Sequence, residues 1–501
     1  MKQTVQPNIP ATKAFLKIKE RQLLIDNQWI NGSTEEMIDS IDPATEQVLA
    51  RIVSAQPEDV DHAVSSSRLA LTQGAWPVMA PSERSRLLWK LADLIEENID
   101  ELAELETLDQ GKPLYVGRWA EIPGAVEQFR YFAGAATKIE GSTIPTSINY
   151  QPEGKKIFAY TRKEPIGVVA AIVPWNSPLV LTAMKLAPAL AAGCTVVLKP
   201  AEDTSLTALR LGELIIEAGF PPGVVNIITG YGAIAGKALA SHMDVDKVIF
   251  TGSTETGRSI LDSAKSNLKK VSIELGGKSP VILMDDANLD LAIPGAANAI
   301  FFNGGQVCVA GSRLYAHSKI YDQVVEKVAD IAKGMKLGHG LLPSTQMGPL
   351  VNKRQVEQVN NFILTAEAEG GSLVTGGKRL DCPGFFIEPT VIANARQDMQ
   401  IVREEVFGPV LVCQKFDDIE EVTELANDSK FGLAASVWTE SLSTAHRMAD
   451  DIHTGTVWIN CHSMFDASLP IGGIKQSGWG QDCGMQALSK YLEVKTVCAV
   501  I

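Results

Sequence analysis

The hydrophobic pattern changes at about residue 163, where short apolar runs begin to alternate with stretches of helical spacing. The runs are rich in β-branched residues and lie at Val168–Val173, Thr195–Leu198, Val224–Ile228, Lys247–Phe250 and Val271–Leu275. Helices are expected between them, with starts near residues 179, 204 and 253. Strands that are covered by helices on both faces are near-continuous apolar runs. The alternation therefore predicts an α/β fold with a doubly wound parallel sheet of the nucleotide-binding type.

A second series of strands and helices follows the first. It predicts a second α/β lobe, which continues to about residue 475 and begins with elements at 280–284, 289–302, 312–317 and 320–335. The last residues, 491–501, alternate and are rich in β-branched side chains, which is typical of a strand. Such a strand leaves an exposed sheet edge unless something covers it.

The first third of the chain is patterned differently. Leucine and isoleucine recur at helical spacing from Leu87 to Leu105, which predicts one long amphipathic helix that starts near Ser82. Another helix is predicted around residues 119–136, and residues 1–20 are typical of a polar tail. Since domains commonly hold about 100–200 residues, we expect the 501 residues to form two large lobes.

Composition and charge exclude several classes of protein. The formal net charge of −14 argues against a nucleic-acid partner, whose phosphates need a basic face, and gives no help in binding an anionic membrane. No run approaches the roughly 18–20 apolar residues of a membrane span, and no secretory signal pattern is found, so we expect a cytoplasmic location. The seven cysteines are scattered without zinc spacing, which predicts reduced thiols and no metal site.

Cys308 is the first candidate for chemistry. Gly304, Gly305 and Gly311 beside it permit tight turns and the close approach of a ligand. Both a buried structural thiol and a catalytic nucleophile fit this local context. As a nucleophile, Cys308 needs thiolate character from a helix N-terminus or from a nearby positive charge.

Four other side chains follow predicted strands, at the edge where doubly wound sheets bind ligands. Glu274 is either a solvated strand end or a general base, and Asn176 is either a turn residue or a donor to an oxyanion. Glu202, after Lys199, is either part of a charged loop or a ribose acceptor that favours NAD over NADP. Ser253 caps a helix and can mark a pyrophosphate site at that N-terminus.

Seven motifs occur along the chain in one order: Pro174-Trp175-Asn176, Lys199-Pro200-Ala201-Glu202, Phe250 to Gly257, Glu274 to Lys278, Gly305 to Cys308, Glu404 to Val410 and Pro470 to Gly478. With these motifs the chain resembles the aldehyde dehydrogenase superfamily over nearly its whole length. The resemblance implies a homo-oligomer, expected to be a tetramer, in which each subunit has three parts. The NAD-binding domain would comprise residues 1–142 and 163–275, and the catalytic domain residues 276–485. A small β oligomerisation flap would comprise residues 143–162 and 486–501.

The resemblance also implies the role of each site residue. Cys308 would form a thiohemiacetal and then a thioester, Asn176 would complete the oxyanion hole, and Glu274 would activate water. The residues that bind NAD would be Pro174, Trp175, Lys199, Glu202, Gly252, Ser253, Gly276, Glu405 and Phe407. Lys185 and Asp482 occupy the positions of a proton relay, although the family commonly has the longer glutamate at the second position.

The substrate tunnel implied by the family would be lined by Ser177, Leu181, Met184, Phe302, Val307, Val309, Phe465 and Ile471. Many relatives have phenylalanine where this chain has Ser177 and Ile471, so the tunnel should be wider while it stays apolar. Such a tunnel fits an aryl group.

The segment from Thr456 to His462, with Phe465-Asp466-Ala467 and Pro470, resembles phenylacetaldehyde dehydrogenases of aromatic catabolism, including styrene degradation. We therefore expect NAD-dependent oxidation of an aromatic aldehyde, phenylacetaldehyde, to its acid. Three alternatives stay open. One is another apolar or medium-chain aldehyde, another is a CoA-acylating semialdehyde dehydrogenase, against which Glu274 counts, and the third is a family member that has become a structural or binding protein.

Overall fold

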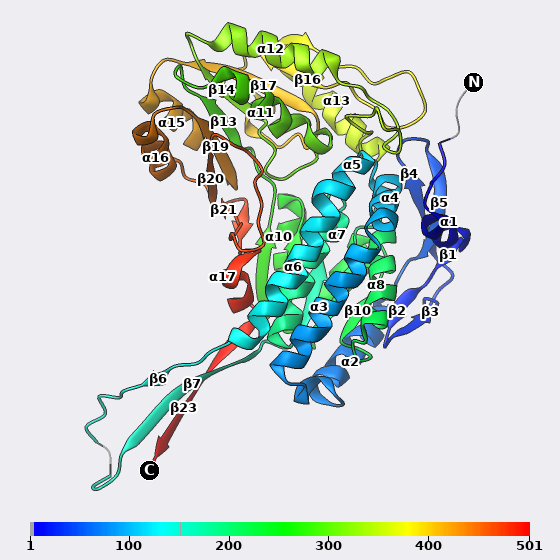
Figure 1. Ribbon diagram of the computed structural model, residues 1–501, viewed down its shortest axis with the longest axis vertical. Coiled ribbons are helices and arrows are strands. Elements are labelled where there is room, and N and C mark those ends of the chain that lie inside the picture. The colour runs from blue at the N-terminus through cyan, green and yellow to red at the C-terminus, as the bar shows by residue number, and fades with distance from the viewer. Residues whose placement is uncertain (1–4, 151) are drawn as a thin grey trace.

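The computed structural model describes residues 5–150 and 152–501, so residues 1–4 and 151 of the expected cofactor domain and flap lie outside it. Two α/β lobes lie end to end, and a narrow β arm projects from the lower one (Figure 1). The doubly wound, two-lobed α/β fold predicted from the sequence is confirmed. None of the helices in the described part of the chain is long and apolar enough to cross a membrane.

The first lobe is built on an eight-stranded sheet. In spatial order its strands are β22 (Gly478–Trp479), β12 (Lys270–Glu274), β11 (Lys247–Thr251), β8 (Val168–Ile172), β9 (Thr195–Lys199), β10 (Val225–Ile227), β2 (Leu23–Ile25) and β3 (Gln28–Ile30). The five central strands, β12 to β10, are parallel, whereas the flanking strands β22, β2 and β3 pair antiparallel.

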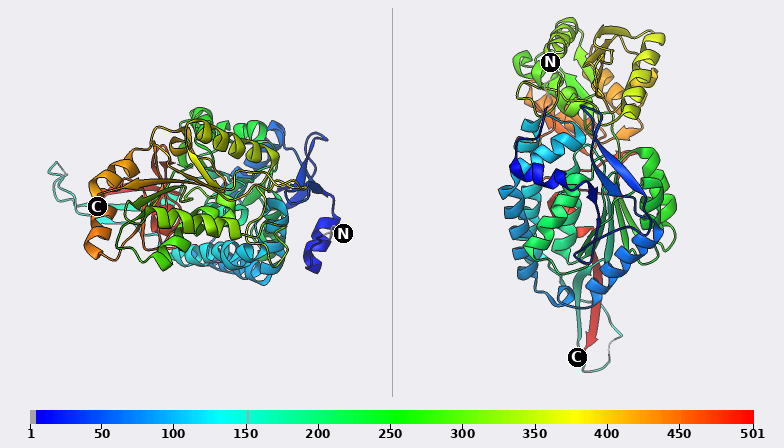
Figure 2. Two further views of the ribbon diagram at one scale, coloured as in Figure 1. Left: turned by 90° about the horizontal axis from the view of Figure 1, so that it is seen from above. Right: turned by 90° about the vertical axis from the view of Figure 1, so that its right-hand side faces the viewer.

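Both faces of this sheet are buried under helices, as Figure 2 shows from the side. Alternate residues of β8 point to opposite faces, so Val169 and Ala171 join one hydrophobic core and Val168 and Ala170 join another. The first core includes α3 (Pro81–Glu97), α4 (Ile99–Gln110), α6 (Ile122–Ala135), α7 (Pro178–Ala192) and α8 (Leu206–Ala218). The second includes α2 (Pro57–Thr72), α9 (Lys237–Ser241) and α10 (Thr254–Ala264).

The second lobe has a seven-stranded sheet. Its order is β15 (Ser372–Thr375), β16 (Thr390–Ala393), β17 (Val410–Phe416), β14 (Arg313–His317), β13 (Pro280–Leu283), β19 (Ala434–Trp438) and β20 (Thr456–Ile459), and only β15 is antiparallel. Its helices are α11 (Leu289–Phe301), α12 (Tyr321–Gly334), α13 (Lys353–Ala368), α14 (Gln400–Arg403), α15 (Ile419–Asn427) and α16 (Leu442–Asp451). The short α17 (Gly484–Ser489) follows the C-terminal crossing back to the first lobe.

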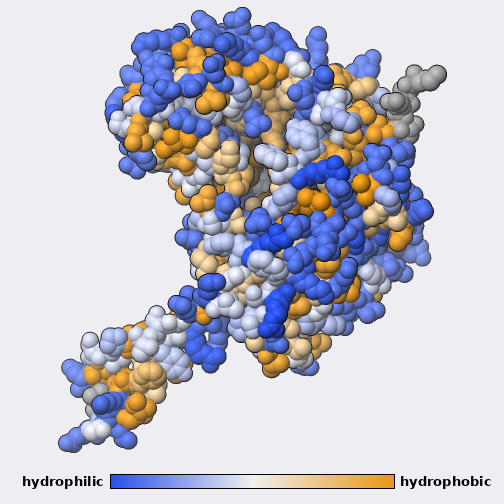
Figure 3. Space-filling view, in the orientation of Figure 1, coloured by the Kyte–Doolittle hydropathy of each residue, from blue (hydrophilic) through white to orange (hydrophobic). Residues whose placement is uncertain are grey.

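The projecting arm is a three-stranded sheet of β23 (Leu492–Val500), β7 (Ile157–Pro165) and β6 (Thr143–Ile144). β23 pairs antiparallel with β7 along its whole length and forms one edge. Apolar residues appear on this arm among polar ones (Figure 3), and its exposed large side chains include Tyr150, Phe158, Val494 and Val500. The predicted C-terminal strand with an open edge is therefore present.

Two predictions for the first third of the chain were wrong. The single long helix is divided at Asn98, because its side chain donates to the carbonyl of Leu94 and caps α3, and α4 then starts in a new direction with almost every residue buried. The expected polar tail contains α1 (Pro10–Lys17), whose Phe15 is buried under the guanidinium of Arg21. In the same region, β1 (Glu20–Arg21), β5 (Gln47–Val53) and β4 (Met37–Asp42) form a small sheet. Much later in the chain, β18 (Phe431–Gly432) and β21 (Ile474–Lys475) form a separate two-stranded sheet.

Candidate functional site

The carboxyl ends of four neighbouring parallel strands place the predicted residues along one edge of the first sheet. Asn176 lies shortly after β8, Lys199 ends β9, Gly252 follows β11 and Glu274 ends β12. These strands are adjacent in the sheet, so residues that are about one hundred apart in sequence share one edge. This is where open α/β sheets bind their ligands.

The loop that carries Cys308 is tied directly to Asn176. The Asn176 side-chain amide donates to the carbonyl of Gln306 at 2.9 Å, and Asn303 donates to the carbonyl of Asn176 at 3.0 Å. An amide NH₂ has two donors, so the second N–H of Asn176 is left for a ligand. Gly305 has φ +71°, and a Cβ there would lie 2.1 Å from a backbone oxygen, so only glycine fits.

The surroundings of Cys308 disfavour its charged form. The residue is partly exposed, but burial of the thiol, together with the carboxylates of Glu405 and Glu274, raises its pKa to about 12. The neighbouring N–H groups of Val309 and of Cys308 itself lower it only in part. Among the described residues, no positively charged side chain is one of the main groups that shift this pKa.

Glu274 has the properties of a poised base. Its Oε2 accepts from the N–H of Gly473 at 3.3 Å, and its Oε1 is buried without a hydrogen-bond partner. Burial, together with the Asp482 carboxylate and against the opposing effect of Lys185, raises its pKa to about 8. A carboxyl that titrates near neutral pH can take up and release a proton under physiological conditions.

Lys185 and Asp482 form a buried ion pair beside Glu274, although they are 297 residues apart in sequence. Asp482 is held by a two-way backbone bridge to Ile471, at 2.8 and 2.9 Å. Gly473, two residues after Ile471, donates its N–H to the carboxylate of Glu274. The shorter aspartate therefore still reaches Lys185.

The predicted cofactor residues form two groups along this edge. In the first, Lys199 pairs with Glu202 at 3.1 Å, and Glu202 also accepts from the Gly232 N–H at 3.4 Å. Although burial acts to raise the pKa of Glu202, the Lys199 ammonium and the hydrogen bonds hold it below its ordinary value. Ser253 caps α10 by accepting from the Thr256 N–H at 3.1 Å, as the sequence predicted.

The second group surrounds the end of β12. Glu405 accepts from the Gly277 N–H at 3.0 Å, and burial raises its pKa to about 7. A Cβ at Gly276 would lie 2.0 Å from the Glu405 carboxylate, so this glycine is needed for the close approach. Phe407 packs edge-on against Trp175, which follows Pro174, with ring centroids 5.2 Å apart.

These groups fit a dinucleotide. A carboxylate beside an ammonium suits ribose hydroxyls, and the uncovered N-terminus of α10 suits a pyrophosphate. The Glu405 carboxylate, which has only one protein donor, has the capacity to accept from a second ribose. By contrast, the described residues contain no cluster of His, Cys, Asp and Glu that could hold a metal ion.

The expected tunnel residues come from three segments. Ser177, Leu181 and Met184 follow one another at helical spacing on α7, on the face that also carries Lys185. Phe302, Val307 and Val309 flank Cys308, and Val309 is fully buried among Leu433, Ala434 and Trp458. From the C-terminal segment, Phe465 packs edge-on against Trp458 at 5.9 Å, and Ile471 borders the cluster that contains Val307 and Cys308.

Sequence reasoning assigned no role to three residues that support the site. Ser477 donates to the carbonyl of Gly276 at 2.7 Å and accepts from the Gly432 N–H at 3.0 Å, which ties the two lobes together. His462 bridges the Val309 carbonyl and Ser436, at 2.8 and 2.9 Å, and burial lowers its pKa to about 4. Glu121 accepts from Ser177 at 2.9 Å. Ser477 and His462 lie in quoted segments, whereas Glu121 gives no local sequence signal.

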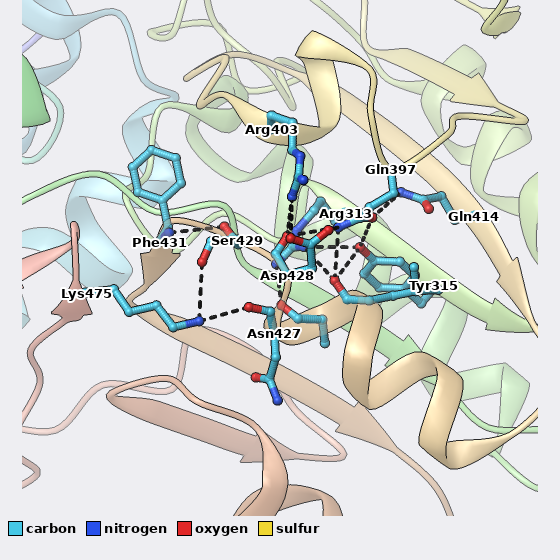
Figure 4. Close-up of polar contacts among 12 residues, drawn as sticks. Arg313, Tyr315, Gln397, Arg403, Gln414, Asn427, Asp428, Ser429, Phe431 and Lys475 are labelled. Atoms are coloured by element: carbon cyan, nitrogen blue, oxygen red, sulfur yellow. Dashed lines mark hydrogen bonds and ion pairs between the residues drawn. The ribbon is translucent and has the colours of Figure 1, made fainter.

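A cluster of polar residues lies behind the site (Figure 4). It connects the loop after α15 to β14, the strand that follows the loop of Cys308. Arg313 is buried in β14 and donates to the carbonyl of Lys278 at 2.8 Å. Asp428 pairs with Arg403 at 2.7 Å on the other side of the cluster. Because Lys278 follows the turn Gly276-Gly277, the cluster helps to hold the backbone beside Glu405 in place.

Comparison with known proteins agrees with this geometry. The model of the aldehyde dehydrogenase family matches residues 29–497. A putative aldehyde dehydrogenase DhaS of Bacillus subtilis is 51% identical over 480 residues, 95% of each chain. A phenylacetaldehyde dehydrogenase of Pseudomonas fluorescens is 48% identical, also over 95% of each chain, and human retinal dehydrogenase 2 is 46% identical over 98% of this chain and 94% of its own.

A solved structure gives the same result for the fold. The NAD+ complex of an aldehyde dehydrogenase from Bacillus cereus superposes with a TM-score of 0.96, at 47% identity, and the match covers 99% of both chains. The fold, the ordered motifs and the relatives therefore agree: this chain belongs to the aldehyde dehydrogenase family.

Proposed function

We propose that this protein oxidises an aromatic aldehyde with NAD, and that phenylacetaldehyde, converted to phenylacetate, is its substrate. The observation that carries the proposal is the meeting of three groups at one sheet edge: the thiol of Cys308, the amide of Asn176 and the buried carboxyl of Glu274. A nucleophile, an oxyanion donor and a base are the set that a thioester mechanism needs.

In the first half of the reaction, the Cys308 sulfur bonds to the aldehyde carbon. The thiol proton leaves to water, and the carbonyl oxygen becomes an oxyanion that accepts from the Asn176 amide and the Cys308 N–H. Bound NAD supplies the acceptor for the hydride that leaves the same carbon. The oxyanion then re-forms the carbonyl as the hydride leaves, and the acyl group remains on Cys308 as a thioester. Atoms and charge are conserved in this step.

In the second half, Glu274 takes a proton from a water molecule as its oxygen attacks the thioester carbon. The C–S bond breaks, the Cys308 sulfur leaves, and the carboxylic acid is released. Lys185 and Asp482 lie beside Glu274 and provide a path by which the proton leaves the site. This use of water is the reason to prefer hydrolysis over acyl transfer to a thiol.

The cofactor preference follows from the first group of cofactor residues. Glu202 would accept hydrogen bonds from the adenosine ribose, and its negative charge would repel a 2′-phosphate. Ser253 and the start of α10 would hold the pyrophosphate, while Glu405 would hold the nicotinamide ribose. The NAD+ complex of the Bacillus cereus relative supports this proposal.

The aromatic substrate is supported by the relative named phenylacetaldehyde dehydrogenase and by the small residues Ser177 and Ile471 at the expected tunnel. The test is an initial-rate comparison of phenylacetaldehyde, benzaldehyde, a medium-chain alkanal and betaine aldehyde, each with NAD and with NADP. We expect the highest kcat/KM for phenylacetaldehyde with NAD. A higher value for the alkanal or for betaine aldehyde contradicts the substrate, and a preference for NADP contradicts the role of Glu202.

The rate should depend on pH through Glu274. Its pKa of about 8 means that the carboxyl is mostly protonated at pH 7 and becomes a base as the pH rises through 8. We therefore expect kcat, measured at saturating aldehyde and NAD, to rise about tenfold per pH unit between pH 6 and 7 and to level off above pH 8. A kcat that is constant from pH 6 to 9 contradicts this assignment.

The assembly and the location of the protein are also proposals. The open edge of β23 and the exposed apolar residues of the arm are suited to pairing with a second copy of the chain. We propose a homotetramer in the cytoplasm, with the arms as the oligomerisation flaps and with the three-part domain division expected from the family. Light scattering of the purified protein distinguishes a tetramer from a dimer.

A further inference from the structure

Three consecutive residues shortly before Cys308 have a left-handed backbone. Asn303, Gly304 and Gly305 have φ angles of +49°, +61° and +71°, respectively. Left-handed residues usually occur singly, and asparagine is one of the few non-glycine residues that adopts this conformation readily. A turn of this kind persists where the surrounding structure holds it, and such turns are concentrated at active sites. The contacts that hold this turn therefore also fix the approach of the chain to Cys308.

The side-chain amides of Gln306, Asn303 and Asn176 form a closed ring of hydrogen bonds, the amide ring. Gln306 donates through Nε2 to the carbonyl of Asn303 at 3.0 Å. Asn303 donates to the carbonyl of Asn176 at 3.0 Å, and Asn176 donates to the carbonyl of Gln306 at 2.9 Å. All three residues are buried, and none is more than 6% exposed. Each side chain therefore holds the backbone of the next residue in the ring.

Gln306 is the member of the amide ring that is also anchored to the start of α13. Its Oε1 accepts from the N–H of Val351 at 3.0 Å, in a buried contact. Val351 directly precedes Asn352, which caps α13 by accepting from the N–H of Gln355 at 2.9 Å. The oxygen and the NH₂ of the Gln306 amide are thus both engaged by backbone groups of the second lobe. The Gln306 side chain thereby fixes the loop that carries the Gln306 carbonyl.

The position of the Gln306 carbonyl decides where the Asn176 amide points. The two N–H donors of an amide NH₂ lie in one plane at a fixed angle. One of them is used on the Gln306 carbonyl, so this contact sets the direction of the other. Donors stabilise an oxyanion because they are aimed at its position before the reaction begins. A shift of the Gln306 carbonyl would therefore turn the second N–H of Asn176 away from the oxyanion.

We infer that Gln306 is the positioning residue for the oxyanion donor, because its side chain holds the backbone carbonyl that orients the Asn176 amide. The inference rests on the proposed function, in which Asn176 stabilises the oxyanion formed from the aldehyde. Gln306 acts through Asn176 and not on the substrate, since its own amide is engaged by the protein. Asn303 supports the same donor from the other side of the ring, where it holds the Asn176 backbone.

The experiment is a double-mutant cycle on the rate of the first turnover. Enzyme with saturating NAD is mixed with a limiting amount of phenylacetaldehyde, and stopped-flow absorbance at 340 nm gives the rate constant of NADH formation. Asn176→Ala should reduce this constant by about 10²–10³-fold, as expected for one oxyanion donor. Gln306→Met removes the amide and keeps the length of the side chain, and it should cost about 10- to 100-fold through misplacement of the donor. In the Asn176→Ala background, Gln306→Met should cost less than about threefold, because residues that act through one another are not additive.

Two readouts separate positioning from a general loss of structure. NAD affinity, measured by fluorescence quenching, should be unchanged in Gln306→Met, since the expected cofactor residues come from other segments. Gln110→Met is the matched control, because Gln110 is also a fully buried glutamine whose Oε1 accepts from a backbone N–H, that of Lys112 at 3.0 Å. It should keep the wild-type rate.

Asn303→Gly is a second variant, which applies even where thermal unfolding shows that Gln306→Met does not fold. It removes the donor to the Asn176 carbonyl, and glycine keeps the left-handed backbone without strain. The amide ring is therefore opened at a different contact. We expect a loss of about 10- to 100-fold in the first-turnover rate, and again little further loss in the Asn176→Ala background.

The outcomes separate this inference from the proposed function. Equal fold losses with and without Asn176→Ala, or wild-type rates in both Gln306→Met and Asn303→Gly, overturn the role of Gln306 and leave the proposed function intact. Loss of NAD affinity in Gln306→Met also overturns it, because the residue is then a general structural support. A wild-type rate in Asn176→Ala overturns the oxyanion donor itself. Failure of the wild-type enzyme to form NADH from any of the four aldehydes overturns the proposed function.

Discussion

Replacing Cys308 with alanine is expected to reduce aldehyde oxidation by about 10⁴-fold or more, because no other group at the sheet edge can form the thioester. NAD should still bind, since the expected cofactor residues come from other segments: Lys199, Glu202 and Ser253 lie in the first lobe and Glu405 in the second. Initial rates with phenylacetaldehyde measure the first effect, and titration of NAD by fluorescence quenching measures the second.

Cys461→Ala is the matched control for that variant. Cys461 is also a free, partly buried cysteine, and it packs against the same small hydrophobic cluster as Cys308. It has no contact with Asn176 or Glu274 among those that the structure describes. We expect Cys461→Ala to keep its activity. Full activity in Cys308→Ala, or loss of NAD binding along with turnover, contradicts the assigned nucleophile.

Glu274→Gln is expected to divide the reaction at the thioester. Glutamine cannot accept a proton from water, so the steady-state rate should fall by about 10²–10⁴-fold. Hydride transfer precedes deacylation, and the first turnover should therefore continue and give a burst of NADH close to the concentration of active sites. Stopped-flow absorbance at 340 nm on mixing enzyme and NAD with phenylacetaldehyde measures both phases.

Two results would contradict this role. A slow first turnover without a burst places Glu274 in acylation rather than in deacylation. Rapid turnover that is restored to Glu274→Gln by coenzyme A, with an acyl-CoA product, favours the CoA-acylating alternative. The wild-type enzyme at pH 6 is a further control, because its Glu274 is mostly protonated there. It should show a burst of NADH that is similar to that of Glu274→Gln but smaller.

Much of the fold was predictable because it depends on local patterns. Apolar runs such as Val168–Val173 are buried on both faces, and helix starts such as Ser253 carry their own cap. The prediction of parallel strands also implies that the residues at their carboxyl ends lie on one edge of the sheet. Asn176, Lys199 and Glu274 could therefore be placed in one region from the sequence.

The rest depends on contacts that no local pattern encodes. Lys185 meets Asp482 across 297 residues, and the sequence could show only that the aspartate is short, not that a backbone bridge to Ile471 holds it within reach. The environment of Cys308 depends on such contacts too. Its pKa is raised by burial and by Glu405, which lies about a hundred residues later in the chain.

The strand that carries Glu274 is completed by one of the last segments to be synthesised. β22 pairs with β12 through Ile273 with Trp479 and Glu274 with Gly478, so Glu274 and its strand partner are 204 residues apart in the chain. At about 5–20 residues per second, a ribosome needs roughly 10–40 s to add them. During that interval β12 is an open edge on a nascent chain, where wrong pairing is a hazard. The segment that pairs with Ile273 and Glu274 is therefore also the one whose arrival covers this end of the open edge.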